Sequence, residues 1–247
     1  MAKVRIGREL MIYGERADSD LPAVLAEVDQ AGYVGLEHWA PRSPEELKQM
    51  RAALNGTGLA FAGGHIELTG LEKPAELGQW IAGVNALGGS YVIASAFWSG
   101  LEAYHKAARM LNEIGQECRD AGVVFCYHNH AHEFESADGT RPIHLLICET
   151  DPALVKLCPD VYWVHVGGES PAEFIARYHE RCPYFHFKDG TKTQFRELGR
   201  GEVDLPAALT AALACQPEWI IVEQDETTLA PAESLRICRE YLKGLGL

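Results

Sequence analysis

The sequence predicts an α/β fold, a single (β/α)8 barrel (TIM barrel) that spans residues 1–247. Three observations lead to this prediction. Eight short apolar runs recur along the chain, longer amphipathic segments separate them, and glycines mark many of the turns in between. The chain length of 247 residues is also close to the roughly 250 residues that such a barrel needs.

The apolar runs are the expected strands of the barrel. They are Val4–Gly7, Val34–Glu37, Leu59–Gly63, Tyr91–Ser95, Val123–His128, Val155–Leu157, Tyr184–Phe187 and Ile220–Glu223. Strands that alternate with helices form parallel βαβ units. A doubly wound open sheet is the alternative to a closed barrel, but the chain has no GxGxxG loop after its first strand, which counts against that alternative.

Capping residues predict where helices begin between these strands. Ser43-Pro44-Glu45-Glu46 and Ser170-Pro171-Ala172-Glu173 each place Ser at the N-cap, Pro at the first helical position and Glu at the third. Asp204 is expected to cap a helix that begins at Leu205. The segment 189–202 is polar, and we expect it to be a long loop at the functional face.

The composition narrows the class of partner. The net charge is −13, whereas nucleic-acid binding depends on Lys and Arg side chains that neutralise phosphates, so DNA and RNA are disfavoured. No apolar run approaches the ~18 residues that cross a bilayer, so no membrane segment is expected. The seven cysteines are odd in number and contain no CxxC pair, which is typical of reduced core thiols in a cytoplasmic enzyme.

Polar residues at the strand ends indicate where chemistry occurs, because TIM barrels place the active site at the carboxyl ends of their strands. Asp160, His186 and Glu223 come from three successive strand ends. Each of them has a structural alternative, as a helix cap, a core histidine or a loop residue. All three at one rim would form a mixed oxygen and nitrogen site that suits Mn²⁺, Mg²⁺, Co²⁺ or Zn²⁺.

A fourth ligand is expected from the fifth strand or its loop. Glu133 is the first choice because it adds a carboxylate, His128 is the second and His130 the third. Strand alternation places His128 and His130 on the same face, so both can point into the mouth of the barrel.

These segments give the chain a family resemblance. It resembles the sugar phosphate isomerase/epimerase family, the xylose-isomerase-like TIM barrels. The segments that carry the resemblance are Tyr-His-Asn-His-Ala-His-Glu-Phe at 127–134, Asp-Val-Tyr-Trp-Val at 160–164, His-Phe-Lys-Asp at 186–189, Leu-Gly-Arg-Gly-Glu-Val-Asp at 198–204 and Ile-Val-Glu-Gln-Asp at 221–225.

The resemblance implies one divalent metal ion, most often manganese, held by ligands from strands five to eight. Many members carry a Glu at the end of strand five, where this chain has His128-Asn129-His130, and many epimerases have a His in place of Trp163. The arrangement of two facing glutamates, which epimerases use, is therefore incomplete here, because only Glu223 is clearly present.

The resulting functional prediction is metal-dependent enolisation of a keto-sugar or related polyol by a sugar isomerase or epimerase. His130 is the expected base, since an imidazole titrates near neutral pH, and Glu223 can share that role. Lys188 is expected to bind a substrate oxygen or stabilise the anion. The expected substrate contacts are Glu37, His65, His128, Trp163 and His165.

The alternative prediction is a metal-dependent lyase. It would eliminate a β-substituent from a 3-keto-sugar or glycoside, as a C-glycoside deglycosidase-like subunit or a keto-inositol dehydratase-like enzyme. The expected partner is a small sugar or glycoside, and a homo-oligomer or a small partner subunit is compatible with the sequence. A metal-dependent endonuclease is disfavoured by the charge of −13, and a binding protein with a decayed site is a further alternative.

Overall fold

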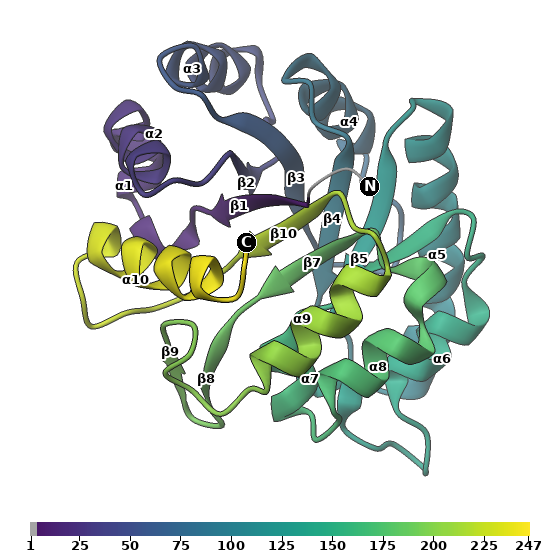
Figure 1. Cartoon of the computed structure of the whole chain (residues 1–247). Coiled ribbons are helices and arrows are strands. Elements are labelled where there is room, and N and C mark those ends of the chain that lie inside the picture. The colour runs from purple at the N-terminus through teal and green to yellow at the C-terminus, as the bar shows by residue number, and fades with distance from the viewer. Residues whose placement is uncertain (1–3) are drawn as a thin grey trace.

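The computed structural model describes residues 4–247 and contains eight parallel strands with helices packed around them (Figure 1). The strands are β1 (Arg5–Glu9), β2 (Gly35–Trp39), β3 (Ala60–Leu68), β4 (Tyr91–Ala96), β5 (Val124–His128), β6 (Val155–Cys158), β7 (Tyr184–Phe187) and β10 (Trp219–Val222). Each lies at one of the eight apolar runs of the sequence. The prediction of eight strands is therefore confirmed.

The strand order shows how nearly the sheet closes. It runs β6-β5-β4-β3-β2-β1-β10-β7. The first and last strands of the chain, β1 and β10, are therefore neighbours in the sheet. Between the ends of this order, β6 and β7, there is an isolated parallel bridge from Asp160 to His186. The His186 amide donates to the Pro159 carbonyl over 3.1 Å at this seam. The sheet is thus a nearly closed barrel, and the open doubly wound alternative does not apply.

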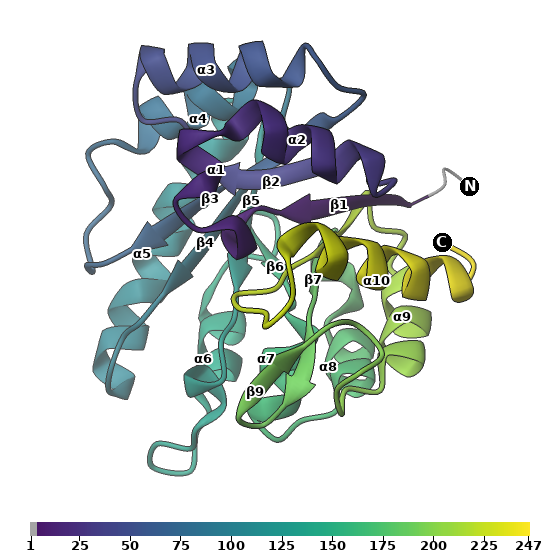
Figure 2. The same cartoon turned by 90° about the vertical axis from the view of Figure 1, so that its left-hand side faces the viewer.

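The helices form an outer layer around the sheet. The α-helices are α1 (Arg16–Ser19), α2 (Leu21–Gln30), α3 (Pro44–Leu54), α4 (Leu77–Ala86), α5 (Leu101–Asp120), α6 (Pro142–Glu149), α7 (Val161–Val166), α8 (Pro171–Arg177), α9 (Leu205–Ala214) and α10 (Pro231–Gly244). The last helix, α10, contacts α2, which completes the ring of helices (Figures 1 and 2). No described helix is long and apolar enough to cross a bilayer.

The predicted helix caps are confirmed. Ser43 Oγ accepts a hydrogen bond from the Glu46 amide (3.2 Å), and Ser170 Oγ accepts one from the Glu173 amide (3.4 Å). Asp204 caps α9 by accepting from the Ala207 amide at 3.1 Å. Each bond satisfies an N–H group that the first turn of a helix otherwise leaves unpaired.

The segment 189–202 is not the featureless loop that its polarity predicted. It contains a two-stranded antiparallel hairpin, β8 (Asp189–Thr191) and β9 (Gln194–Arg196). The Asp189 carboxylate organises the rest of the segment, because it accepts hydrogen bonds from the amides of Gly190, Gly199, Gly201 and Val203 over 2.8–3.2 Å. A Cβ at Gly201 would lie 2.1 Å from Asp189 Oδ1, so glycine is required there.

The interior of the barrel is filled with side chains below its mouth. A buried cluster inside the barrel includes Tyr91, Ile93, Tyr184, Trp219 and Ile221. A second and larger apolar layer lies between the sheet and the helices. Because the interior is packed, polar chemistry is confined to the carboxyl ends of the strands. In Figure 2 the β1 arrow points toward that end and away from both chain termini.

Candidate metal centre

Four buried side chains from the last four strands converge at the mouth of the barrel. His128 ends β5, Asp160 precedes α7, His186 lies on β7 and Glu223 follows β10. One ligand atom from each of these residues lies within 4.8 Å of the others. The structure thus brings together the three residues that the sequence placed at one rim, and it adds His128 from strand five.

Two atoms of this group are buried without a hydrogen bond in the described chain. Asp160 Oδ1 caps α7 by accepting from the Trp163 amide over 2.9 Å, so the helix-capping interpretation of Asp160 is correct for one oxygen. Its Oδ2 atom has no hydrogen bond, and neither has Nδ1 of His128. Buried polar atoms in native proteins almost always have a partner, so two orphans in one cluster indicate that a further group binds there.

His186 is held between two carboxylates. Its Nε2 atom is hydrogen-bonded to Glu37 at 2.8 Å, and its Nδ1 atom is hydrogen-bonded to Glu223. Burial alone would lower the pKa of His186, but Cys158 and the Glu37 and Glu223 carboxylates hold it well above its usual value. Glu37 therefore fixes the ring and directs Nδ1 toward Glu223, which is the arrangement that metal-binding histidines commonly have with an outer carboxylate.

Lys188 lies beside the same group, on the far side of Glu223 from His186. Its ammonium donates to Glu223 Oε1 (2.9 Å) and Asp225 Oδ1 (2.7 Å), and it lies 3.6 Å from Asp160 Oδ2. Burial would lower the pKa of Lys188, but these carboxylates raise it, so the side chain stays charged. Lys188 is thus held in salt bridges at the mouth, and its expected substrate role stays a prediction.

The carboxylates at the mouth outnumber the cations that could balance them. Burial raises the pKa of Asp160 to about 7, although Lys188 opposes the shift. Burial also raises the pKa of Asp225 to about 6 and, with the nearby Glu223 and Glu37 charges, that of Glu9 to about 8. Carboxylates that are forced toward their neutral form lack positive charge around them. Both the buried atoms without hydrogen bonds and the excess of carboxylates therefore favour binding of a divalent cation at this site.

The donor set indicates the kind of ion. Two imidazoles and two carboxylates suit Zn²⁺, Mn²⁺, Co²⁺ and related ions. A softer set of His128, Cys158 and His186 also has its ligand atoms within 4.8 Å. Burial raises the pKa of Cys158 to about 12, so this thiol is protonated in the metal-free site, whereas Asp160 and Glu223 offer carboxylate oxygens.

Glu133, the first choice for the fourth ligand, is not brought to this group. It is fully buried, and its two oxygens accept from the Tyr127 hydroxyl (2.6 Å) and the His130 amide (2.7 Å). Burial raises its pKa to about 8. Its ligand atom groups instead with His130 and His132. The geometry therefore favours His128, the second choice, as the fourth ligand.

His130 lies next to the group without belonging to it. Its ring centroid is 4.9 Å from that of His128 and 5.6 Å from that of Trp163. The side chain is half-buried, and its Nδ1 atom has no partner in the described chain. Burial lowers the pKa of His130 to about 3, so the imidazole is neutral at physiological pH and a weaker base than the near-neutral titration expected from the sequence.

Of the other residues expected to contact substrate, His65 and Trp163 lie at the mouth of the barrel and His165 does not. His65 lies in the mouth, where its two nitrogens are hydrogen-bonded to Glu37 (2.9 Å) and Ser95 (3.0 Å). The Trp163 ring lies 5.1 Å from the Lys188 ammonium. His165 lies on the last turn of α7, and within residues 4–247 its side chain contacts none of these residues, so the structure does not bring it into the site.

Glu37 is placed differently from its expected role at a substrate hydroxyl. Its side chain is wholly buried, and three protein donors use its two oxygens: His65, His186 and Tyr184, whose hydroxyl donates over 2.7 Å. Burial would raise its pKa, but the His186 charge and the hydrogen bonds from both histidines lower it to about 2. Glu37 is thus an anion that orients the two histidines.

The sequence analysis did not identify two groups at the mouth. Glu9 ends β1, two residues beyond the run that we assigned to that strand, so a longer first strand would have revealed it. Phe97 follows β4 with 65% of its surface exposed, and its ring stacks on His132 at 4.9 Å and lies 4.8 Å from His130. An apolar run that continues past a strand end was the available signal for Phe97.

The fold and this site together define a TIM barrel with a candidate centre for one divalent metal ion at its mouth. The family model described as "Xylose isomerase-like TIM barrel" matches residues 25–243, and the chain belongs to that family. The resemblance seen in the sequence is thereby confirmed.

Three known proteins illustrate what this chain is similar to. An inosose dehydratase of Geobacillus kaustophilus is 25% identical over 268 aligned positions, which cover 90% of this chain and 86% of the relative. A sugar phosphate isomerase/epimerase structure from Parabacteroides distasonis has a TM-score of 0.84 at 19% identity, with 98% of both chains covered. The structure of the IolI protein with a zinc atom has a TM-score of 0.78 at 16% identity, again covering 98% of both chains.

Proposed function

We propose that this protein is a metal-dependent enzyme that enolises a cyclic keto-sugar or keto-polyol and then eliminates a β-substituent, in the manner of a dehydratase or lyase. The observation that carries the proposal is the convergence of His128, Asp160, His186 and Glu223, with the neutral His130 imidazole beside them. The inosose dehydratase similarity over 90% of the chain supports a keto-polyol as the substrate class.

The four converging side chains would hold the ion, which we expect to be Mn²⁺, with Co²⁺ or Zn²⁺ as substitutes. When bound, the ion supplies a Lewis acid that stabilises negative charge as it develops on a carbonyl oxygen. His186 is oriented to bind the ion, because Glu37 accepts a hydrogen bond from its Nε2 atom and its Nδ1 atom then faces Glu223.

His130 is the proposed base. Its unpartnered, neutral imidazole stands at the mouth, where it can take the proton from the carbon next to a carbonyl. The backbone of His130 is fixed, because its amide donates to the buried Glu133 carboxylate over 2.7 Å. Lys188 supplies a positive charge that stabilises the enolate, and protonated His130 returns its proton to the departing group.

Elimination is favoured over epimerisation because the mouth offers few free bases. Epimerisation with two facing bases needs a second group opposite the first. Glu37 and Glu133 are both buried, and protein donors use all of their oxygens. His130 is the base that we assign, since Glu223 is held by His186 and Lys188, and elimination needs only one base together with an acid for the leaving group.

The test is incubation of the Mn²⁺-loaded protein in D₂O with keto-inositols, 3-keto-sugars and simple ketoses. We expect loss of water or of a glycosidic substituent from a cyclic ketone, detected as an enone by ultraviolet absorbance and NMR. Deuterium exchange with inversion but without elimination would favour the isomerase or epimerase activity instead. The absence of exchange and of product over the whole panel would contradict the enolisation itself.

A matched pair of variants tests the assigned base. His130→Gln should lower kcat about 10²- to 10⁴-fold, the usual contribution of a general base, while metal binding persists. His132→Gln is the control, because His132 is also an imidazole of this loop and stacks on Phe97 but has no assigned role. Equal activity in the two variants would exclude His130 as the base.

A further inference from the structure

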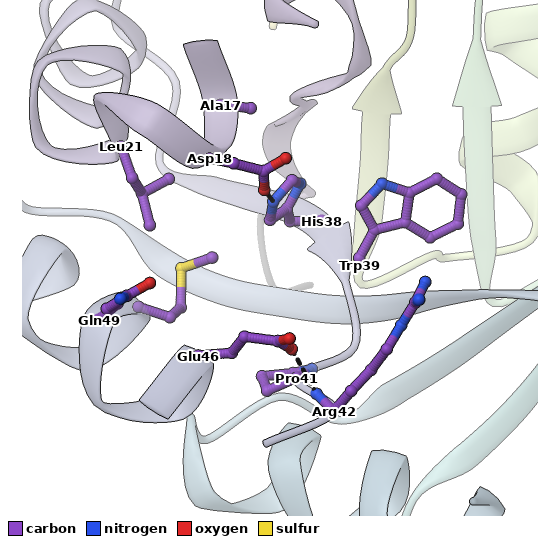
Figure 3. Close-up of a pocket in the computed structure, with 10 residues that line it drawn as sticks. Ala17, Asp18, Leu21, His38, Trp39, Pro41, Arg42, Glu46 and Gln49 are labelled. Carbon is purple, nitrogen blue, oxygen red and sulfur yellow. Dashed lines mark hydrogen bonds and ion pairs between the residues drawn. The ribbon is translucent and has the colours of Figure 1, made fainter. Parts of the chain in front are cut away.

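A second hollow lies beside the mouth of the barrel, among α1, α2, the end of β2 and the start of α3 (Figure 3). Its volume is about 460 Å³, and Asp18, His38, Trp39, Arg42, Glu46 and Gln49 supply its polar and aromatic lining. This volume lies in the range of small-molecule binding sites. The proposed chemistry uses none of these residues, so the pocket needs an explanation of its own.

Trp39 is the wall that this pocket shares with the candidate metal centre. It ends β2 and pairs in register with His65 of β3. The Trp39 and His65 rings are 5.4 Å apart in an edge-to-face arrangement, and the His65 ring is 5.6 Å from that of His128. His65 therefore lies between Trp39 and His128, and Trp39 lines the pocket. A glycoside with one ring at the mouth would extend past His65 toward Trp39.

The wall of the pocket contains a buried histidine that lacks a partner. His38 is 8% exposed, and its Nδ1 atom has no hydrogen bond in the described chain. Its Nε2 atom is 3.8 Å from Asp18 Oδ1, which is longer than a hydrogen bond. Burial lowers the pKa of His38, so the ring is neutral and suited to a hydroxyl group. Nδ1 of His38 is therefore a hydrogen-bonding group that the described chain leaves unused.

Arg42 is a second free group at this pocket. Within residues 4–247 its guanidinium makes no hydrogen bond or ion pair, although its backbone amide donates to Glu46 Oε2 over 2.6 Å. In Figure 3 the Arg42 side chain extends from the floor of the pocket toward the Trp39 ring. Five guanidinium donors are thus available on the side of the pocket that faces the mouth.

The charges select the class of ligand. Two carboxylates, Asp18 and Glu46, face one guanidinium, that of Arg42, while His38 is neutral. This excess of negative charge disfavours a phosphate or carboxylate. A neutral sugar ring fits, because its hydroxyls donate to carboxylates and accept from a guanidinium, and its apolar face packs against an indole.

We propose that this pocket is a second sugar subsite, which binds the distal ring of a glycoside whose keto-sugar ring lies at the candidate metal centre. The inference rests on the proposed function for the position of the first ring. It adds that the preferred substrate is larger than a monosaccharide, and that Trp39 separates the reacting ring from the distal one.

The experiment compares two substrates in three variants of the Mn²⁺-loaded protein. The substrates are 3-keto-glucose and 3-keto-glucose disaccharides of different linkage. Arg42→Ala and Asp18→Asn should each raise the KM for the best disaccharide about tenfold, the effect of losing one hydrogen bond to a charged group, and leave kinetics on the monosaccharide unchanged. Lys48→Ala is the control, because Lys48 is an exposed cation of α3 that does not line the pocket.

Binding is also measured by calorimetry with the unoxidised parents, cellobiose, maltose, trehalose and glucose, which lack the ring ketone that the proposed reaction needs. Tighter binding of one disaccharide than of glucose, weakened by Arg42→Ala and Asp18→Asn, would support the subsite even if no keto-sugar reacts. In that case only the proposed reaction would be wrong. If no disaccharide binds more tightly than glucose, or if the variants change both substrates equally, the subsite is refuted.

Discussion

Glu37 offers the most demanding prediction, because it acts on the metal centre without belonging to it. Glu37→Gln keeps the shape of the side chain but replaces one carboxylate oxygen with an NH₂ group. Three donors converge on the two oxygens: His65 Nδ1 at 2.9 Å, His186 Nε2 at 2.8 Å and the Tyr184 hydroxyl at 2.7 Å. In the variant at least one buried donor must face the amide nitrogen and lose its acceptor.

The expected effects follow from this count. One buried donor without an acceptor costs about 1–3 kcal/mol, so we expect the free energy of unfolding to fall by about 2 kcal/mol. Glu37 also holds the Nε2 proton of His186, which leaves Nδ1 for the ion. The loss of such an outer carboxylate lowers metal affinity about 10- to 100-fold, which corresponds to about 1.4–2.8 kcal/mol.

The assay is titration of Mn²⁺ or Zn²⁺ into metal-free protein by calorimetry, with urea unfolding of the same samples. Tyr184→Phe is the matched control, since it removes one hydrogen bond to Glu37 but leaves the carboxylate and the His186 tautomer intact. It should bind metal almost as tightly as the wild type. If Glu37→Gln bound the metal as tightly as the control, Glu37 would not position His186.

Three further predictions concern charge and packing. Lys188→Met removes the cation that lies beside Glu223, Asp225 and Asp160. The gain in Tm on adding Mn²⁺ should therefore be larger in the variant than in the wild type. An equal or smaller gain would show that Lys188 and the metal ion do not balance the same negative charge. Burial would raise the pKa of Glu169, but hydrogen bonds from His144 (2.7 Å) and Arg141 (2.6 Å) lower it. Because this pKa is lower in the folded state, Glu169→Gln should reduce the free energy of unfolding by about 1 kcal/mol at pH 7. In urea unfolding, the difference from wild type should vanish as the pH falls below about 4. A difference that persists in acid would refute this prediction. Gly35→Ala should lower the free energy of unfolding in urea by about 1–3 kcal/mol, because its Cβ would lie 2.3 Å from the Trp219 ring. An unchanged free energy of unfolding would show that the interior can adapt.

The fold was predictable because its signals are local. Each strand is a short apolar run, and the caps at Ser43, Ser170 and Asp204 depend on residues three positions apart. The hairpin β8–β9 was missed because its polar sequence has no apolar alternation. It is held instead by the Asp189 carboxylate, which accepts from amides up to 14 positions away, and such contacts leave no periodic signal.

Residues of the candidate site that lie at strand ends could be predicted from the sequence. Contacts between residues on opposite sides of the barrel could not. Asp160, His186 and Glu223 each lie at a strand end, so barrel topology alone predicts that they meet. The bond between Glu37 and His186 joins residues 149 positions apart, on strands that are not neighbours. The choice between Glu133 and His128 depended on the path of the loop after β5, which turns Glu133 toward Tyr127.

Anomalous diffraction from crystals of the protein soaked in Mn²⁺, recorded on both sides of the manganese absorption edge, tests the site most directly. We expect one strong manganese peak within coordination distance of His128, Asp160, His186 and Glu223. A peak among His130, His132 and Glu133 instead, or no peak at all at saturating Mn²⁺, would contradict the assignment of these four side chains as the ligands.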